Sequence, residues 1–140
     1  RPAIVPGTVL ENLGVGGEPT PELLEAAALT GFDGVVATLT QGWNTLLGQG
    51  GVGLSVGQRQ RLALTRALVS TRPFVILDEP SAHLDAMNEK YVTRSVRALK
   101  QAGHTVVVIA HRRAILGEAD NIIDVVATAD TSAVETEVAQ

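Results

Sequence analysis

The sequence predicts an α/β fold in which a parallel sheet is joined to a small helical subdomain. Two apolar runs without polar alternation, 74–77 and 105–110, are typical of central parallel strands that are covered on both faces. The helical pattern over 85–102 supplies the crossover that parallel strands require. A short helical pattern over 113–119 and an apolar run over 121–127 then predict a third strand. Strand, helix, strand, helix, strand is the element order of a parallel α/β core.

The first part of the chain predicts short helices with local start and stop signals. Thr8 and Glu11 form a capping-box pattern at the start of one helix. A second helix begins at 20–21 and is stopped by Gly31, and a third short helix covers 32–39. Together these predict a small helical unit ahead of the sheet.

A glycine-rich segment over 42–53 is expected to form a structured loop rather than a free linker. Trp43 and the Leu46-Leu47 pair are its apolar anchors. Trp43 is interpreted as a packing residue and not as a platform for stacking a base.

Length and composition allow one hydrophobic core. The 140 residues are 45% hydrophobic, which suits one domain or a piece of one. A net charge of -4 without a Lys/Arg cluster argues against a nucleic-acid partner. The absence of cysteine excludes thiolate catalysis and zinc-cysteine sites. No apolar run reaches the roughly 18 residues of a membrane span, so a membrane role has to come through a partner segment.

Two acids follow the first apolar strand, at the place where open α/β sheets bind ligands. Asp78 and Glu79 end the run, and Pro80 comes next. Phosphoryl transfer needs a carboxylate that holds magnesium and a polar group that orients the attacking water. Adjacent acids at a strand end can supply both. The structural alternative is that one of them caps the turn beside Pro80.

The turn before the arginine-rich helix is a candidate phosphate clamp. Ser55 is a natural N-cap for a helix that ends near Ser70, and the unpaired N–H groups of a helix start attract anions. The run 58–61 adds polar side chains to the first turn, where an anion would lie. The alternative is an ordinary helix start, since Ser is a preferred N-cap anywhere.

Four motifs in this order carry a resemblance to ATP-binding cassette (ABC) proteins, which covers about residues 1–126. They are the signature motif 54–58 with its helix through 68, the Walker B strand 74–80, the loop 81–85 and the switch-histidine segment 109–112. The resemblance implies that the α/β fold is part of a P-loop NTPase core with a parallel sheet and a helical subdomain.

The resemblance also implies roles in ATP hydrolysis. Asp78 would help to hold Mg²⁺, Glu79 would polarise the attacking water, and His111 would contact the γ-phosphate and that water. Asp85 would act at the interface between two cassettes, although it can equally be a plain N-cap for a helix that begins at Ala86. For His111 the alternative is a solvated histidine at a strand end.

The signature residues would act on the partner's nucleotide, because cassettes of this family dimerise head to tail. Ser55, Val56, Gly57 and Gln58 would clamp the ATP that the opposite cassette holds. The family usually has glycine at position 56. A β-branched residue resists a positive φ and stands closer to the ligand, so we expect a weakened or asymmetric clamp.

The family's phosphate-binding loop, Gly-x-x-x-x-Gly-Lys-Ser/Thr, is not in the sequence. Residues 48–55 have its spacing but place Leu54 where the lysine belongs. The expectation is the C-terminal part of a cassette, with a helical subdomain and loop over 1–53, an ATPase-core part over 54–128 and a disordered tail over 129–140. Such a chain is expected to be inactive alone.

The segment 6–12 resembles the sequence after the glutamine loop of exporter-type cassettes. This implies an ATPase, with ATP and Mg²⁺ as cofactors, that couples hydrolysis to export at the cytoplasmic face of the plasma (inner) membrane. The chain itself is expected to be soluble, and its partners would be a second nucleotide-binding domain and the transmembrane domains. Residues 82–85 are similar to the bacterial exporters of cysteine and glutathione that serve cytochrome bd assembly. The alternatives are a soluble cassette ATPase of translation or DNA repair, and a non-catalytic dimerisation or interaction piece.

Overall fold

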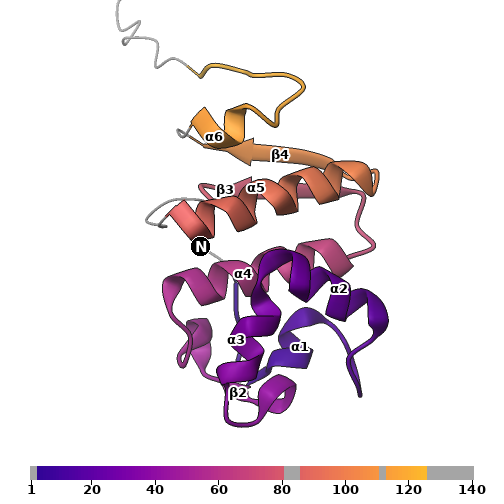
Figure 1. Ribbon diagram of the computed structural model, residues 1–140, viewed down its shortest axis with the longest axis vertical. Coiled ribbons are helices and arrows are strands. Elements are labelled where there is room, and N and C mark those ends of the chain that lie inside the picture. Colours follow the sequence, from indigo (N-terminus) through magenta and orange to yellow (C-terminus); the bar gives the residue numbers. More distant parts are fainter. Residues whose placement is uncertain (1–2, 81–85, 111–112, 126–140) are drawn as a thin grey trace, which may run out of the picture.

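The computed structural model describes residues 3–80, 86–110 and 113–125, which form a helical unit and a two-stranded sheet stacked along the long axis (Figure 1). Each part has its own buried apolar cluster. The helical core consists of Ile4, Val9, Leu10, Leu13, Leu23, Ala27, Phe32, Val35, Val36, Leu47, Leu54 and Leu62. The sheet core consists of Leu64, Val92, Val96 and Ile115.

The short helices form where their caps predict them. Thr8 and Glu11 make both hydrogen bonds of the capping box, with Glu11 Oε2 accepting from the Thr8 N–H at 2.7 Å. Thr20 caps the second helix, and Gly31 ends it with a left-handed φ of 69°. The observed bounds are α1 Val9–Leu13, α2 Pro21–Thr30 and α3 Phe32–Thr38.

The glycine-rich segment is a structured loop, but one of its expected anchors is wrong. Trp43 meets Phe32 edge-on with ring centroids 6.2 Å apart, so its packing role is confirmed. Leu47 is buried, whereas Leu46 is 71% exposed, because successive residues of a strand point to opposite faces. The short elements here are β1 Gly7–Thr8, η1 Gly42–Asn44, β2 Leu46–Leu47 and η2 Gln49–Gly51, and β1 pairs antiparallel with β2.

The sheet has the parallel arrangement that the sequence predicts. Its strands pair in register from Phe74 opposite Thr105 to Asp78 opposite Ile109. The crossover helix ends at Gln101 and is followed by a turn in which Gly103 has a left-handed φ of 86°. The bounds are α4 Val56–Val69, β3 Phe74–Asp78, α5 Ala86–Gln101, β4 Thr105–Ile109 and α6 Arg113–Leu116.

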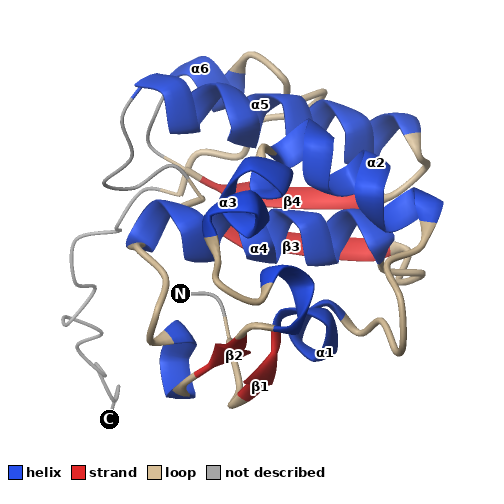
Figure 2. Cartoon of the chain, turned by 60° about the horizontal axis from the view of Figure 1, so that its bottom comes forward, coloured by secondary structure: helices blue, strands red, loops and turns tan. Residues whose placement is uncertain are grey.

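The strands are covered on one face, not on both as expected. Leu77 and Val108 pack against the sheet core, which α4, α5 and α6 build, and Figure 2 shows α4 in front of β3 with α5 running above the strands. Phe74 and Ile76 on the other face are 53% and 61% exposed. An unbroken apolar run indicates burial on both faces, but helices cover only one face of this pair.

The third strand is also a wrong prediction for the residues that the structure describes. Residues 121–125 form no strand, and Ile123 and Val125 are 86% and 93% exposed. A strand forms only where a neighbour supplies a hydrogen-bond ladder, which an apolar run does not guarantee. Residues 126 and 127, and the tail expected over 129–140, lie outside the described ranges. No helix in those ranges is long and apolar enough to cross a membrane.

Candidate functional site

The two predicted acids lie at the carboxyl end of β3, where parallel strands present ligand-binding groups. Asp78 is exposed and pairs in register with Ile109 at the end of β4. The Glu79 N–H donates to the Ile109 carbonyl at 2.8 Å, so the ladder extends one residue beyond the strand. Asp78 therefore has a rigid base and an open approach.

Glu79 has an unusual backbone. Its φ is 43°, and it is the one non-glycine residue with a positive φ in the described part of the chain. A non-glycine residue in this region is held there by its surroundings at a cost of about 1–3 kcal/mol. The hydrogen bond to Ile109 and the buried Pro80 on its other side fix this turn. The strained residue is the one that, by the resemblance to ABC proteins, would polarise the attacking water.

Asp85 and His111 lie outside the described residues. The described chain ends on one side of the gap at Ala110, directly after Ile109, the residue whose carbonyl accepts from Glu79. The structure thus brings Asp78 and Glu79 together at the end of the sheet. It does not describe the other residues expected there.

A carboxylate set of this kind fits Mg²⁺ as a partial site. Mg²⁺ prefers oxygen ligands, keeps several waters and is commonly bound by one or two carboxylates together with substrate phosphates. Asp78 offers an exposed carboxylate at the strand end. No group of three or more potential ligands gathers within the described ranges, so phosphate oxygens and water would complete the coordination.

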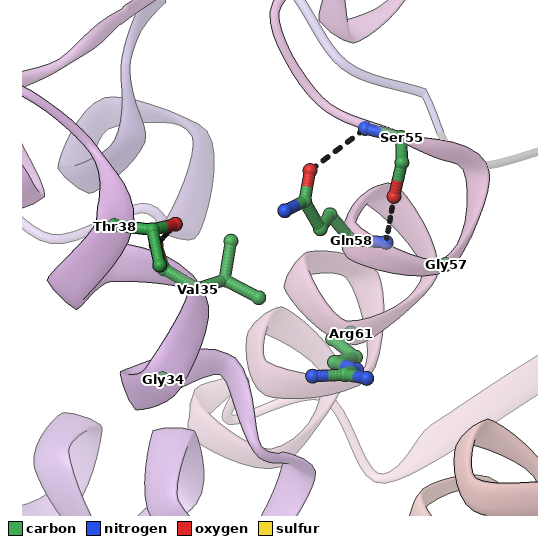
Figure 3. A pocket seen from close by; sticks show the side chains of 7 residues that line it. All are labelled: Gly34, Val35, Thr38, Ser55, Gly57, Gln58 and Arg61. Atoms are coloured by element: carbon green, nitrogen blue, oxygen red, sulfur yellow. Dashed lines mark hydrogen bonds between the residues drawn. The ribbon is translucent and has the colours of Figure 1, made fainter.

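The signature residues form a capping box at the start of α4. Ser55 Oγ accepts from the Gln58 N–H at 3.3 Å, and Gln58 Oε1 accepts from the Ser55 N–H at 2.8 Å (Figure 3). The sequence prediction that Ser55 is the N-cap is confirmed. The capping box uses the N–H groups of Ser55 and Gln58. The N–H groups of Val56 and Gly57 are therefore those that the start of α4 can present to an anion.

Val56 does not have the strained backbone that its side chain would resist. It is the first residue of α4 and is not among the described residues with a positive φ. The expected conflict between a β-branched residue and a positive φ therefore does not arise. Its side chain is 56% exposed, so what remains is an isopropyl group projecting beside the clamp.

A cavity of about 320 Å³ lies beside the clamp, between α3 and the first turns of α4 (Figure 3). Its walls are mostly small or polar. They are Gly34, Val35 and Thr38 from α3, and Ser55, Gly57, Gln58 and Arg61 from α4. This placement identifies the face of the helical unit to which the clamp belongs.

Two arginines of α4 donate hydrogen bonds to backbone carbonyl groups outside the helix. Arg59 Nη1 donates to the Leu54 carbonyl at 2.8 Å, and Arg61 Nη1 donates to the Gly31 carbonyl at 3.2 Å. Gln58 is used in the capping box. The polar run 58–61 therefore serves structural contacts in addition to any ligand, which a list of residue types could not indicate.

The sequence reasoning missed an interaction behind the cavity. The Arg61 guanidinium carbon lies 4.5 Å from the centroid of the Tyr91 ring on α5. Tyr91 lies within the predicted helix over 85–102, to which the sequence analysis gave no functional role. The sequence signal that could have indicated this contact is the position of the two residues, since each lies in the second turn of its helix.

Comparisons with known proteins agree with this geometry. A family model described as ABC transporter matches residues 7–82. The alpha-hemolysin translocation ATP-binding protein HlyB of Proteus vulgaris is 38% identical over 118 residues, covering 83% of this chain and 16% of that protein. The toxin RTX-I translocation ATP-binding protein of Actinobacillus pleuropneumoniae is 40% identical over 107 residues, covering 76% and 15%.

A solved structure shares both fold and sequence. The bacterial Atm1-family ABC exporter with ATP bound superposes with a TM-score of 0.70 at 31% identity, over 84% of this chain and 21% of that one. The chain thus spans about one sixth of the length of the curated relatives and a fifth of the structural one. Its α/β fold is that of the ABC ATPase, a P-loop NTPase fold. The chain belongs to the ABC transporter family.

Proposed function

We propose that this chain is part of the nucleotide-binding domain of an ABC exporter and that it couples ATP binding and hydrolysis to transport. The observation that carries the proposal is the placement of the motifs. The capping-box clamp at Ser55 opens α4, while Asp78 and Glu79 end a strand that α4 precedes. Clamp and acids are thus on different elements, as the head-to-tail dimer of the family requires.

Asp78 and Glu79 serve one nucleotide site. Asp78 would hold Mg²⁺, which when bound would supply charge that neutralises the phosphate oxygens. Glu79 would polarise the attacking water and accept its proton. The fixed turn at Glu79 supports this role, because a backbone held by strand pairing leaves only the freedom of the side chain to be lost when the substrate binds. Asp85 at the dimer interface and His111 at the γ-phosphate complete the proposal.

Ser55, Val56, Gly57 and Gln58 serve the nucleotide of a second nucleotide-binding domain. The N–H groups at the start of α4 and the Ser55 hydroxyl face an anion, and the helix dipole favours negative charge there. The capping box keeps Ser55 and Gln58 in place before the partner arrives. The exposed Val56 side chain narrows the approach, which makes this clamp weaker than one with glycine.

The remaining partners are transmembrane domains, at the cytoplasmic face of the plasma (inner) membrane. The relatives are named as alpha-hemolysin and RTX-I toxin translocation proteins, which favours an exporter over a soluble ATPase of translation or DNA repair. They give no support to thiol export for cytochrome assembly, whose similarity rests on residues 82–85 outside the described ranges. No nucleic-acid partner is proposed, because the chain carries a net charge of -4.

The 140-residue chain should not bind ATP tightly by itself, because it has no lysine in a phosphate-binding loop. Calorimetric titration with magnesium and ATP is expected to show no micromolar binding. Micromolar affinity would show that the missing loop is not needed and would contradict this part of the proposal.

The catalytic assignment is tested in a chimaera. In it, this chain replaces the matching 118 residues of the Proteus vulgaris relative, which then supplies the rest of the domain. Glu79→Gln should lower kcat by about 10²- to 10⁴-fold while ATP-driven dimerisation persists. Glu25→Gln, at an exposed position of α2, is the matched control and should leave kcat unchanged.

Two outcomes would overturn the proposal. Full turnover of the Glu79→Gln chimaera would remove the role of Glu79. A chimaera that dimerises with ATP but never hydrolyses it would favour the non-catalytic interaction piece.

A further inference from the structure

Three residues from different elements meet where the helical unit joins the sheet. Arg61 on α4 places its guanidinium over the Tyr91 ring of α5, with 4.5 Å from its carbon to the ring centroid. The same side chain donates from Nη1 to the Gly31 carbonyl at 3.2 Å. We call Gly31, Arg61 and Tyr91 the junction cluster.

Gly31 leaves no space between itself and the Tyr91 ring. A Cβ built on Gly31 would collide with Cζ, Cε1 and Oη of that ring. Its φ of 69° is also in the left-handed region, which favours glycine. The hydroxyl end of the Tyr91 ring therefore lies against the α2–α3 turn, and the ring receives the Arg61 cation on its face.

The junction cluster touches the elements that build the clamp cavity. Arg61 itself lines the cavity, one turn after Gln58 (Figure 3). Gly31 directly precedes α3, which supplies the opposite wall of the cavity. Tyr91 lies in the second turn of α5, the helix that follows the acids at the end of β3. One stacked pair thus links the helix of the clamp to the helix that leaves the hydrolysis site.

We infer that Arg61 and Tyr91 are positioning residues that set the clamp end of α4 relative to α5. The inference rests on the proposed function, because the position of the clamp matters only if the clamp contacts a nucleotide. Arginine suits this task better than lysine, since its planar guanidinium stacks on a ring while a nitrogen at its edge donates to a carbonyl. Removing the ring would let the first turn of α4 shift against the sheet, so that its capping box opens more often.

A purely structural role predicts a different pattern. If the pair only stabilised the fold, replacing it would speed hydrogen exchange at every protected amide by the same factor. If it positions the clamp, the effect concentrates at the start of α4. The Gln58 and Arg59 N–H groups are suitable probes, because they donate to Ser55 Oγ at 3.3 Å and to Ser55 O at 2.9 Å.

The test is amide hydrogen exchange on the 140-residue chain, followed by NMR. Tyr91→Leu should speed exchange at Gln58 and Arg59 by roughly 3- to 30-fold, the range that one cation–π contact supports. Amides of the β3–β4 ladder should keep their rates. Tyr91→Phe retains the ring and should behave as the unsubstituted chain.

Arg61→Lys separates charge from geometry and should give faster exchange at the same two amides. Arg66→Lys is the matched control, because Arg66 also lies on α4 and donates to a backbone carbonyl, Ala3 O at 2.7 Å. It should leave Gln58 and Arg59 unchanged. An upfield ring-current shift of the Arg61 side-chain protons, lost in Tyr91→Leu, is the direct signature of stacking.

Uniform acceleration of all amides in Tyr91→Leu, or equal effects of Tyr91→Phe and Tyr91→Leu, would overturn the inference. In the ATPase chimaera, Tyr91→Leu should lower kcat with little change in KM for ATP, since the clamp acts on a nucleotide that the partner already holds. Loss of turnover in the unsubstituted chimaera would count against the proposed function, whereas the exchange results would still decide the role of the pair.

Discussion

The chain's two phenylalanines lie in environments that differ as much as its two regions do. Phe32 in the helical unit is fully buried, while Phe74 at the start of β3 is 53% exposed. The short helices surround their apolar residues from several directions and close a core. The sheet has helices on one face, and its other face presents Phe74, Ile76, Val107 and Ile109. Apolar composition alone therefore does not indicate burial.

Helix α4 belongs to both regions and explains how they are joined. Leu62 packs in the helical core, and two residues later Leu64 packs in the sheet core. Between the cores, Thr65 Oγ1 lies 2.7 Å from Thr30 Oγ1 of α2, and both side chains are buried. Each hydroxyl also has a carbonyl partner in its own helix, Ala27 O for Thr30 and Arg61 O for Thr65, so the contact between α2 and α4 leaves no buried hydroxyl without a hydrogen bond. The signature motif thus opens a helix that two cores hold.

The largest expected effect comes from deleting the two phenylalanine rings in turn. Phe32→Ala should lower the free energy of unfolding by about 3–5 kcal/mol, the cost of a large cavity in a closed core. Phe74→Ala, the matched variant, should cost about 1 kcal/mol, because half of its side chain is already in water. Urea unfolding followed by circular dichroism measures both. Equal losses would show that the open face of the sheet is covered in solution.

Two glycines sharpen the comparison next. Gly31 and Gly103 both have a left-handed φ, at 69° and 86°. A Cβ on Gly103 would meet nothing within 4 Å, while one on Gly31 would collide with Tyr91. Gly103→Ala should therefore cost about 1–2 kcal/mol from backbone strain. Gly31→Ala should cost about 2–4 kcal/mol, because overpacking is added to strain.

Thermal unfolding of the two glycine variants provides the measurement. Combining Gly31→Ala with Tyr91→Leu should recover part of the loss, since the shorter side chain relieves the collision. If the double variant is no more stable than Gly31→Ala, the packing explanation is wrong.

The smallest expected effect is a pH dependence at the surface of the sheet region. Arg97 on α5 donates to both carboxylate oxygens of Glu118, at 3.1 and 2.6 Å. This hydrogen bond, with the charges of Arg97 and Lys100, lowers the pKa of Glu118 below its ordinary value, while burial opposes the shift. The stabilisation is therefore present above the unfolded-state pKa of about 4.3 and is lost as the pH falls through the lower folded-state value.

A double-mutant cycle isolates this pair. The variants are Arg97→Gln, Glu118→Gln and their combination, each unfolded in urea at several values between pH 7 and pH 3. The coupling between the two positions should be small at pH 7 because the pair is at the surface, and it should decrease steadily towards the acid end. A coupling that does not change with pH would mean that ionisation of Glu118 plays no part.

The sequence by itself determined the local structure of this protein. Thr8, Thr20, Ser55 and Gly31 begin or end helices where they were expected, because capping depends on groups within a few residues of one another. The order of the signature and Walker B motifs also identified the family before any coordinates. The roles of Ser55 to Gln58, Asp78, Glu79, Asp85 and His111 stay predictions, and so does the division of the chain at residue 53.

Only the tertiary structure decided which apolar residues are covered and which remote residues meet. The open face of β3, the missing strand over 121–125 and the stacking of Arg61 on Tyr91 all depend on neighbours far away in the sequence. The relaxed backbone of Val56 follows from its place in α4, and the strained one of Glu79 follows from the turn after β3. A strand or a stacked pair exists only where a partner is brought within a few ångströms, and residue types do not encode that distance.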